Sequence, residues 1–233
     1  MSLQDRFDYF TKTLTPIPLP PKCLNISDVH ASAGGSKDPL VASGVEPVII
    51  DTLKEYLSKG YCLLKNGDWW DTWRGESLVD IFSAHQELVE IVDEYKDIGH
   101  LFEILGNHER NLCSYPPVII FEGYGIRIFM DHGYLEDWPN DEGWRIGRFA
   151  VRAAKELGID PETSPHPSNI ERHLAVRKMR EVLADNNPEW IFIYGHTHYQ
   201  ERVGANLYNS GTSVNGRVEG INIIEGEVIL KIF

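Results

Sequence analysis

Cysteine is scarce in this chain: Cys23, Cys62 and Cys113 lie far apart, without a CxxC spacing. An odd number of widely spaced thiols does not build the disulfide framework that stabilises small secreted domains. We therefore expect isolated thiols in a reducing compartment.

Long apolar runs are also missing. No stretch approaches the ~18 consecutive apolar residues of a membrane-spanning helix. The N-terminal sequence MSLQDRFDYF is polar and carries acids, which is not the pattern of a secretory signal peptide. These two absences predict a cytoplasmic protein without a membrane span.

Positive charge is in deficit, with 22 Lys and Arg against 35 Asp and Glu, a net charge of −13 and a pI near 5.1. Such a surface repels nucleic acid and anionic membranes unless a local patch or a bound metal reverses the field. The charge therefore argues against nucleic acid as a partner, because counterion release needs basic side chains.

Two common catalytic motifs are absent as well. The chain contains no GxSxG nucleophile elbow and no GxxxxGK[ST] phosphate-binding loop. Neither a serine hydrolase of the elbow type nor a P-loop enzyme is indicated.

What the chain does contain is enough apolar material for one core, with 42% hydrophobic and 11% aromatic residues in 233. The first half predicts strands over 22–27, 61–66 and 101–105, separated by helices over 47–60 and 78–97. This β-α-β-α-β order implies parallel strands with right-handed crossovers. Ligands bind such sheets beyond the carboxyl ends of the strands.

The second half departs from this alternation. Residues 117–133 predict two strands around a glycine turn, and residues 190–198 predict a strand that ends in a polar cluster. The tail, 221–233, predicts a hairpin that turns near Glu225 and Gly226. Strands dominate this half outside one helical segment.

That segment, residues 134–189, predicts a cap-like insertion with helices over 144–157 and 168–186. We expect residues 1–233 to form one domain that contains it. Earlier in the chain, residues 31–45 are rich in small and turn residues and predict a long mobile loop. One face of the first insertion helix either contacts substrate phosphates or is merely solvated: Arg145, Arg148, Arg152 and Lys155.

Polar side chains follow one predicted strand after another. They are oxygen and imidazole donors, which borderline divalent metals accept as ligands. A single histidine or aspartate at such a place is usually structural, but several at one sheet edge together predict a metal site. The set comprises Asp28, His30, Asp68, Asn107, His132, His196 and His198. The remaining histidines lie off this edge, and we interpret them as structural: His85, His100, His166 and His173.

Five short motifs carry these residues in order: SDVH, GDWWD, GNHE, HG and GHTH. Together they resemble the signature blocks of the calcineurin-like metallophosphoesterase superfamily, and the resemblance spans residues 24–198. One small departure is Ser27, where many members have glycine. It affects the local backbone and not a ligand.

The resemblance implies an α/β fold, a four-layer α/β/β/α sandwich of the metallophosphoesterase type with a helical insertion. It also implies two divalent transition-metal ions, with manganese, iron and zinc all compatible with the mixed ligands. One ion would be bound by Asp28, His30 and His198, and the other by Asn107, His132 and His196. Asp68 would bridge both.

The activity implied is hydrolysis of a phosphomonoester or phosphodiester by a metal-bridging hydroxide. His108 would assist the leaving group as a catalytic residue, and Asp71 would support this shell. A small phosphorylated substrate would contact Asn107, His108, Arg110 and Trp73. The motif tryptophans are expected to pack partly beneath the site, while Trp70 or Trp73 reaches toward the insertion.

Two alternatives stay open at this stage. GDWWDTW and the helical insertion resemble the UDP-2,3-diacylglucosamine hydrolase branch, whose members cleave a pyrophosphate in a lipid precursor. That branch typically has arginine where this chain has His108, and the insertion here carries more acids than basic residues. The other alternative is a catalytically silent scaffold of the same fold, although such proteins usually lose ligands. The oligomeric state is left open.

Overall fold

The structure is a computed structural model that describes residues 1–33, 35, 38–74, 77–109, 117–135, 167–214 and 216–233. Its helices are α1 (Leu3–Thr13), α2 (Pro39–Ser43), α3 (Glu46–Ser58), α4 (Leu78–Ala84), α5 (Gln86–Asp97) and α7 (Pro167–Asn186), with 3₁₀ turns η1 (Thr72–Arg74) and η2 (Asn107–Glu109). None of the described helices combines the length and apolar composition needed to cross a membrane.

The strands form two sheets. The first has the order β11 (Glu227–Ile232), β10 (Glu219–Ile224), β2 (Lys22–Ile26), β3 (Cys62–Asn66), β4 (Leu101–Ile104). The second has the order β1 (Ile17–Pro18), β5 (Val118–Gly123), β6 (Ile126–Asp131), β7 (Trp190–Tyr194), β9 (Leu207–Asn209), β8 (Glu201–Val203). The parallel pairing of β2, β3 and β4 agrees with the β-α-β-α-β prediction.

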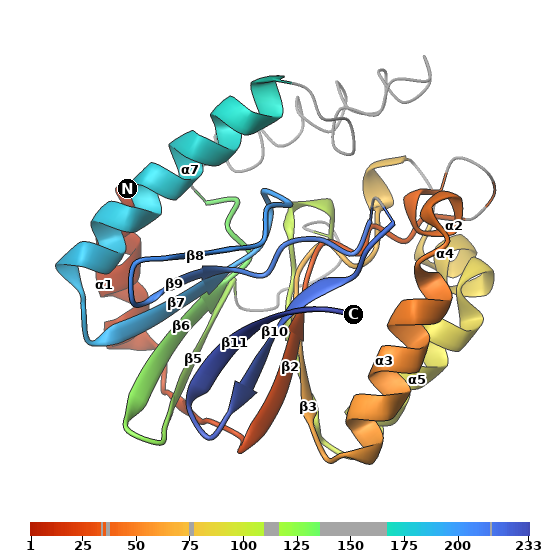
Figure 1. The fold of residues 1–233 in the computed structure, drawn as a ribbon, viewed down its shortest axis with the longest axis horizontal. Helices are drawn as coiled ribbons and strands as arrows, with labels where there is room; N and C mark the ends of the chain where they lie inside the picture. The colour runs from red at the N-terminus through yellow and green to blue at the C-terminus, as the bar shows by residue number, and fades with distance from the viewer. Residues whose placement is uncertain (34, 36–37, 75–76, 110–116, 136–166, 215) are drawn as a thin grey trace.

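The two sheets face each other and helices cover their outer sides (Figure 1). Three apolar clusters fill the spaces between the layers: one joins α3 and α5 to the first sheet, one lies between the sheets, and one joins α1 and α7 to the second sheet. The predicted four-layer α/β/β/α architecture is therefore confirmed.

The strands carry apolar side chains on both faces, because each sheet is covered on one side by helices and on the other side by the second sheet. Leu63 packs in the cluster under the helices, and its neighbour Leu64 packs between the sheets. In the second sheet, Phe129 faces the helices, whereas Ile128 and Met130 face the other sheet. Successive side chains point to opposite faces of a strand, so a strand covered on both sides needs an unbroken apolar run.

Helix α7 covers the second sheet and leads into β7, which pairs in parallel with β6. Val176, Leu183 and Ala184 on α7 pack in the cluster that also contains Phe7 of α1. Residues 167–186 of the predicted insertion 134–189 thus contribute an outer layer of the sandwich. The helix predicted over 144–157, with its basic face, lies outside the described residues.

Three local predictions were wrong or incomplete. The single helix predicted over 78–97 is two helices, because the backbone leaves helical geometry at His85. The loop predicted over 31–45 contains α2, whose first turn is capped by the Asp38 carboxylate. Strands β1, β8 and β9 were not predicted, since two or three residues are too few to show a period. Helix α1 was also missed, although Leu3, Phe7 and Phe10 follow a helical spacing and Ser2 caps the first turn.

His85 is buried where α4 and α5 meet, and both ring nitrogens contact acids. Its Nε2 lies 2.7 Å from Asp38 Oδ2 and 2.7 Å from the carbonyl oxygen of Ser32, and its Nδ1 lies 2.7 Å from Glu46 Oε1. Although burial opposes the charged form, the two carboxylates raise the pKa of His85 to about 9. The break in the predicted helix therefore places a protonated imidazole between two acids.

We expect this cluster to make the free energy of unfolding depend on pH. The folded-state pKa lies above the unfolded value of about 6.5, so protonation favours the folded state. The contribution is complete below pH ~6.5 and is lost as pH rises toward ~9, by about 2–3 kcal/mol. Urea denaturation at pH 6 and pH 9.5 measures it. His85→Gln should flatten this difference and His100→Gln should keep it; equal pH dependence in wild type and His85→Gln would refute the assignment.

Candidate metal centre

The carboxyl ends of five strands from both sheets meet at one edge of the sandwich. Asp28 follows β2, Asp68 follows β3 and Asn107 follows β4, while His132 and His196 follow β6 and β7. All five side chains are buried, with exposed fractions of 3% or less. The edge that the strand pattern predicted is thus where these side chains gather.

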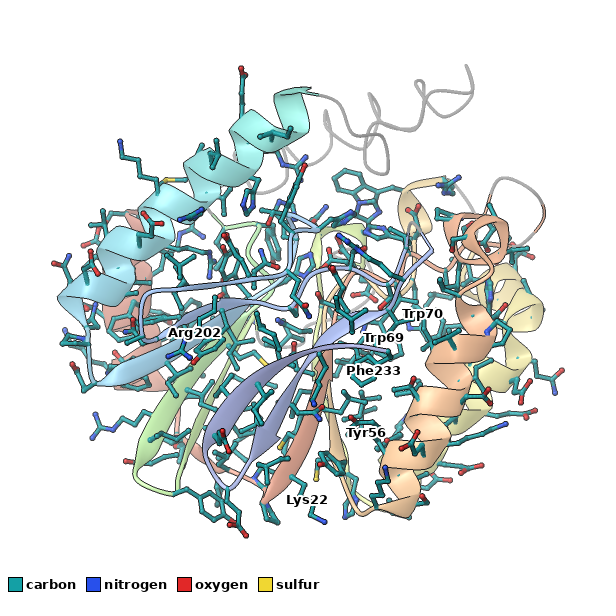
Figure 2. The ribbon with its side chains drawn as sticks, in the orientation of Figure 1. Lys22, Tyr56, Trp69, Trp70, Arg202 and Phe233 are labelled. Atoms are coloured by element: carbon teal, nitrogen blue, oxygen red, sulfur yellow. The ribbon has the colours of Figure 1, made fainter. Side chains whose placement is uncertain are left out.

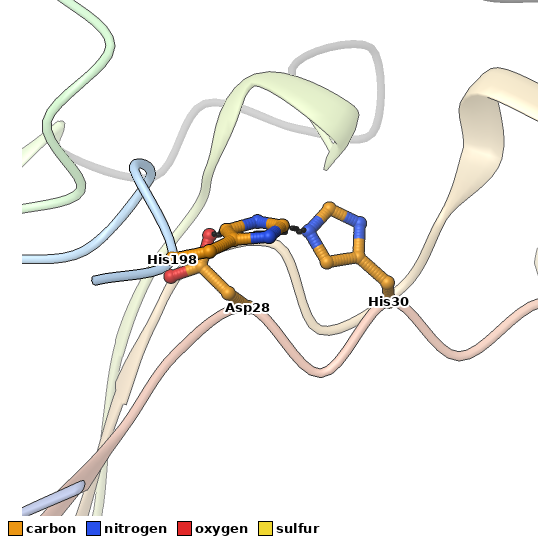
Figure 3. Close-up of side chains that lie close together, drawn as sticks. All are labelled: Asp28, His30 and His198. Atoms are coloured by element: carbon orange, nitrogen blue, oxygen red, sulfur yellow. Dashed lines mark hydrogen bonds and ion pairs between the residues drawn. The ribbon is translucent and has the colours of Figure 1, made fainter. Parts of the chain in front are cut away.

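A first group consists of Asp28, His30 and His198 (Figure 3), whose ligand atoms all lie within 4.8 Å of one another. His198 Nε2 lies 3.2 Å and His30 Nε2 lies 3.9 Å from Asp28 Oδ1. The two Nε2 atoms are 3.1 Å apart. Two ligand atoms from the loop after β2 and one from a residue 168 positions after His30 therefore point into one small space.

A second group consists of Asp68, His132 and His196, again within 4.8 Å. His132 Nδ1 lies 2.8 Å from the carbonyl oxygen of Asn66, so this nitrogen carries the proton in the neutral ring. The other nitrogen, Nε2, points to Asp68 Oδ2 at 3.0 Å and to Asp28 Oδ1 at 3.9 Å. His132 thus connects the two groups.

The imidazoles of the centre stabilise the ionised forms of its buried carboxylates. Burial alone would raise the pKa of the Asp28 carboxyl, but the imidazoles of His132, His198 and His30 hold it well below its usual range. Burial opposes ionisation of Asp68 in the same way, and His132 and His108 lower its pKa. Both carboxylates are therefore ionised although they are buried. Such acids need positive charge beside them.

The backbone of the centre is strained. Left-handed φ values of 51° to 69° occur at five non-glycine residues of the predicted ligand set: Asp28, His30, Asp68, His196 and His198. The other described non-glycine residues with positive φ, Tyr124 and Glu225, sit in hairpin turns before glycines. Each such conformation costs about 1–3 kcal/mol and persists where the surroundings enforce it, which is typical of functional sites.

Glycines allow the strand ends to approach this closely. A Cβ atom on Gly106 would collide with the Asp68 carboxylate, and one on Gly195 would collide with Ser27 Oγ and the Asp28 carboxylate. Ser27, the departure from the family pattern, hydrogen-bonds the Asp28 carboxylate and lies 2.7 Å from Ser210 Oγ. The glycines of GNHE and GHTH are therefore needed for space.

His108 lies beside the second group and is held from three sides. Its Nδ1 lies 2.7 Å from Asp71 Oδ1, and its backbone N–H donates to Asp68 Oδ1 at 2.9 Å. The Trp73 ring stacks on the imidazole, with centroids 4.3 Å apart and planes 17° apart. On the opposite edge of the ring, Nε2 lies 3.9 Å from Asp68 Oδ2. The imidazole therefore faces the same space as the candidate ligands.

The chain that forms this centre matches a known protein family. A model of the calcineurin-like phosphoesterases matches residues 21–200, which include every motif described above. This chain belongs to the calcineurin-like phosphoesterase family. Membership supports metal-dependent hydrolysis of phosphoesters in general terms and confirms the resemblance that the motifs indicated.

Solved structures similar to this calcineurin-like phosphoesterase are distant in sequence. A predicted phosphoesterase from Streptococcus pneumoniae TIGR4 is 13% identical, with 91% of this chain and 88% of that chain covered and a TM-score of 0.45. A Vps29 single mutant from Entamoeba histolytica is 13% identical, with 91% and 98% covered and a TM-score of 0.41. A mutant cold-active protein tyrosine phosphatase is 15% identical, with 91% and 82% covered and a TM-score of 0.40. No curated protein matches at a significant level.

The donor set of this centre suits a divalent metal. Asp28 Oδ1 is buried and makes no hydrogen bond to the described residues, although nitrogens of three histidines lie 3.2–3.9 Å away. A buried acceptor ringed by imidazole nitrogens is the arrangement that a cation would satisfy. The described residues of both groups therefore fit a metal.

The three tryptophans of the GDWWD region divide by position. Trp69 and Trp70 pack in the core under the helices (Figure 2), and Trp69 Nε1 donates to the carbonyl oxygen of Ile26 at 3.1 Å. Trp73 is 1% exposed and donates its Nε1–H to the carbonyl oxygen of Asn107 at 2.9 Å. Trp73 thus supports His108 and the Asn107 loop from beneath. Its contact with a substrate stays a prediction, and Arg110 lies outside the described residues.

Glu109 is a structural organiser that the sequence interpretation missed. Its fully buried carboxylate accepts the backbone N–H groups of Asp68, Trp69, Trp70 and Gly106 at 2.9–3.1 Å. Lys65 Nζ lies 3.8 Å from it and balances its charge. The acid at the end of GNHE thus binds the loop after β3 to the loop after β4. The motif contained the residue but gave no sign of its partner loop.

Replacing Glu109 by alanine should lower the free energy of unfolding by roughly 2–4 kcal/mol, because four buried N–H groups lose their acceptor. Metal content should fall with it, since these N–H groups fix the strained Asp68 backbone. Urea denaturation and elemental analysis measure both effects. Glu122→Ala is the matched control: that acid is exposed and pairs with Arg127, so stability should change by less than about 0.5 kcal/mol. An equal change in both variants would contradict this role.

Proposed function

We propose that this protein is a dinuclear-metal-dependent phosphoesterase that acts on a small phosphorylated substrate. One observation carries the proposal: two groups of metal-ligand side chains, buried except for the half-buried His198, lie side by side at one sheet edge, and a third group joins His108 to His30 and Asp71. Four strand ends supply the first two groups, and family membership points to the same chemistry.

In this proposal Asp28, His30 and His198 hold one ion, and Asn107, His132 and His196 hold the other. Asp68 would contact both ions. The short distances from His132 Nε2 to the Asp68 carboxylate (3.0 Å) and to the Asp28 carboxylate (3.9 Å) support this role, because they bring the two groups together. Mixed nitrogen and oxygen donors suit manganese, iron or zinc. The net charge of the chain, −13, makes binding of cations favourable from a distance.

When bound, a pair of divalent ions activates a water for attack and neutralises charge on the phosphoryl oxygens. The chain's own residues prepare the leaving group. His108 Nδ1–H donates a hydrogen bond to the Asp71 carboxylate, which stabilises the protonated ring, so that the ring can give its Nε2 proton to the departing alkoxide. Trp73 and the buried surroundings fix the orientation of this proton.

The proposal is tested with the full chain loaded with Mn²⁺, Fe²⁺ or Zn²⁺. We expect about two equivalents of bound metal by elemental analysis and turnover of p-nitrophenyl phosphate or bis-p-nitrophenyl phosphate, abolished by a chelator. Bound metal without turnover on a broad phosphoester panel would identify a silent scaffold. Cleavage restricted to nucleotide-sugar pyrophosphates would instead favour the lipid-pyrophosphatase alternative.

A further inference from the structure

Helix α7 contacts the centre at three points along its length. Arg172 Nη2 lies 3.3 Å from His196 Nε2, and His173 Nδ1 lies 3.0 Å from Thr197 Oγ1. Two turns later, Arg180 forms a bidentate pair with Asp131, the residue before His132, at 2.8 and 2.6 Å. The helix is therefore held against the ends of β6 and β7.

The buried Arg180–Asp131 pair fixes the position of α7 along the strands of the second sheet. Both side chains are 1% exposed, and the Arg180 guanidinium lies 4.6 Å from the centroid of the Tyr194 ring. His173 adds a second fixed point, because Thr197 stands between two predicted ligands. These two contacts hold the turn of α7 that carries His173 in one position. Arg172 lies on the same turn, so its position is fixed as well.

Arg172 differs from the other described cations at this edge in where it points. Arg74 Nε donates to Asp71 at 2.8 Å, and Arg180 pairs with Asp131, so both act on residues behind the ligands. The Arg172 guanidinium reaches the imidazole of His196, which belongs to the second ligand group. It stands at the rim of the centre.

The contact between Arg172 and His196 is one that metal binding must break. A guanidinium only donates hydrogen bonds, so His196 Nε2 accepts in the structure described. A neutral imidazole bound to a metal through one nitrogen carries its proton on the other and has no lone pair left for a donor. In a metal-loaded protein His196 Nε2 would therefore no longer accept from Arg172 Nη2, and another acceptor would take its place.

We propose that this acceptor is a terminal phosphoryl oxygen, and that Arg172 makes the centre selective for phosphomonoesters over phosphodiesters. The inference rests on the proposed function. A monoester carries about two negative charges and three acceptor oxygens, which a planar guanidinium fork matches well. A diester carries about one charge and one fewer terminal oxygen, so it gains less from the same fork.

The test compares Arg172→Ala and Arg172→Lys with wild type and with Arg177→Ala, all as full chains loaded with Mn²⁺. Arg177 is the matched control because it lies on the same helix and pairs with Glu181 at 2.7 Å, away from the ligands. Three quantities are measured: bound metal, the Kd of inorganic phosphate by calorimetry, and KM and kcat for p-nitrophenyl phosphate and its bis ester.

Arg172→Ala should keep its metal and weaken phosphate binding by about tenfold, a change of about 1.4 kcal/mol. KM for the monoester should rise by a similar factor, the diester should change little, and Arg172→Lys should recover part of the affinity. Phosphate affinity equal to that of Arg177→Ala, loss of metal in both Arg172 variants, or no phosphate binding by the loaded wild type would overturn the inference. Absence of turnover in wild type would refute the proposed function alone, since the phosphate measurement still decides the role of Arg172.

Discussion

Replacing His108 by alanine should lower kcat for a phosphoester by about 10²–10⁴-fold, the usual contribution of a positioned general acid. The proton on Nε2 would no longer be available to the leaving oxygen. Metal content should change little, because the imidazole belongs neither to the group of Asp28, His30 and His198 nor to the group of Asp68, His132 and His196, and because Asp68 keeps the His108 backbone N–H as its donor. Steady-state kinetics with elemental analysis of the same samples measure both quantities.

Substrates with different leaving groups distinguish a His108 ring that donates a proton from one that has only a structural role. In His108→Ala, kcat should fall less for a substrate with a good leaving group, such as a nitrophenyl ester, than for an alkyl ester. The leaving oxygen of the nitrophenyl ester needs less protonation. Asp71→Asn should reproduce part of the defect, since the Nδ1 partner of His108 changes from an acid to an amide. His100→Ala is the matched control. Equal losses on both leaving groups together with released metal would rule out acid catalysis by His108.

Much of this centre could be predicted from the sequence because its residues follow strands. Parallel strands bring their carboxyl ends to one edge, so Asp28, Asp68 and Asn107 were expected together once β2, β3 and β4 were recognised. His132 and His196 were expected at the same edge because each follows a predicted strand. The parallel pairing of β6 and β7 itself was not predicted.

What could not be predicted depends on contacts between segments far apart in the chain. Glu109 accepts hydrogen bonds from a loop about 40 residues earlier, as its contact with Trp69 shows. The helix predicted over 78–97 breaks at His85, whose ring contacts Asp38 and Glu46. The apolar periodicity of residues 78–97 contains no information about either acid. Arg172 is one of several basic residues on α7, and nothing in its spacing marks it.

The position of Trp73 illustrates the same limit. The sequence interpretation expected this ring to contact the substrate, but the motif does not show which way the ring faces. In the structure it stacks on His108 and is almost fully buried. Its indole therefore stabilises the orientation of a proposed proton donor, a role for which an aromatic face is suited because it packs flat against an imidazole.

The strained backbone connects stability with function. Left-handed φ values at Asp28 and Asp68 are tolerated because hydrogen bonds hold both residues: Asp28 N–H donates to the carbonyl oxygen of Gly67, and Asp68 N–H donates to Glu109. Two ionised carboxylates add repulsion at the same edge. Cations would relieve that repulsion, so metal should raise the free energy of unfolding of this protein.

Asp68→Asn should have the largest effect on the centre as a whole. It removes one negative charge from the residue proposed to contact both ions, and it replaces a carboxylate that His132 approaches at 3.0 Å. We expect metal content to fall to one equivalent or less and turnover to fall on the order of 10³-fold or more. Elemental analysis measures the metal content and phosphoester kinetics measure the turnover, and the shift in melting temperature on adding Mn²⁺ is a third, independent measurement.

The asparagine variant should still fold, because its amide oxygen can accept the His108 N–H that Asp68 Oδ1 accepts at 2.9 Å. Its melting temperature without metal should therefore stay near that of wild type, whereas the increase on adding Mn²⁺ should shrink. Asp93→Asn, on the exposed face of α5, is the matched control and should retain both metal and turnover. If Asp68→Asn kept its full metal content and its Mn²⁺-dependent stabilisation, Asp68 would not be shared by the two ions. The two groups of ligands would then act as separate sites.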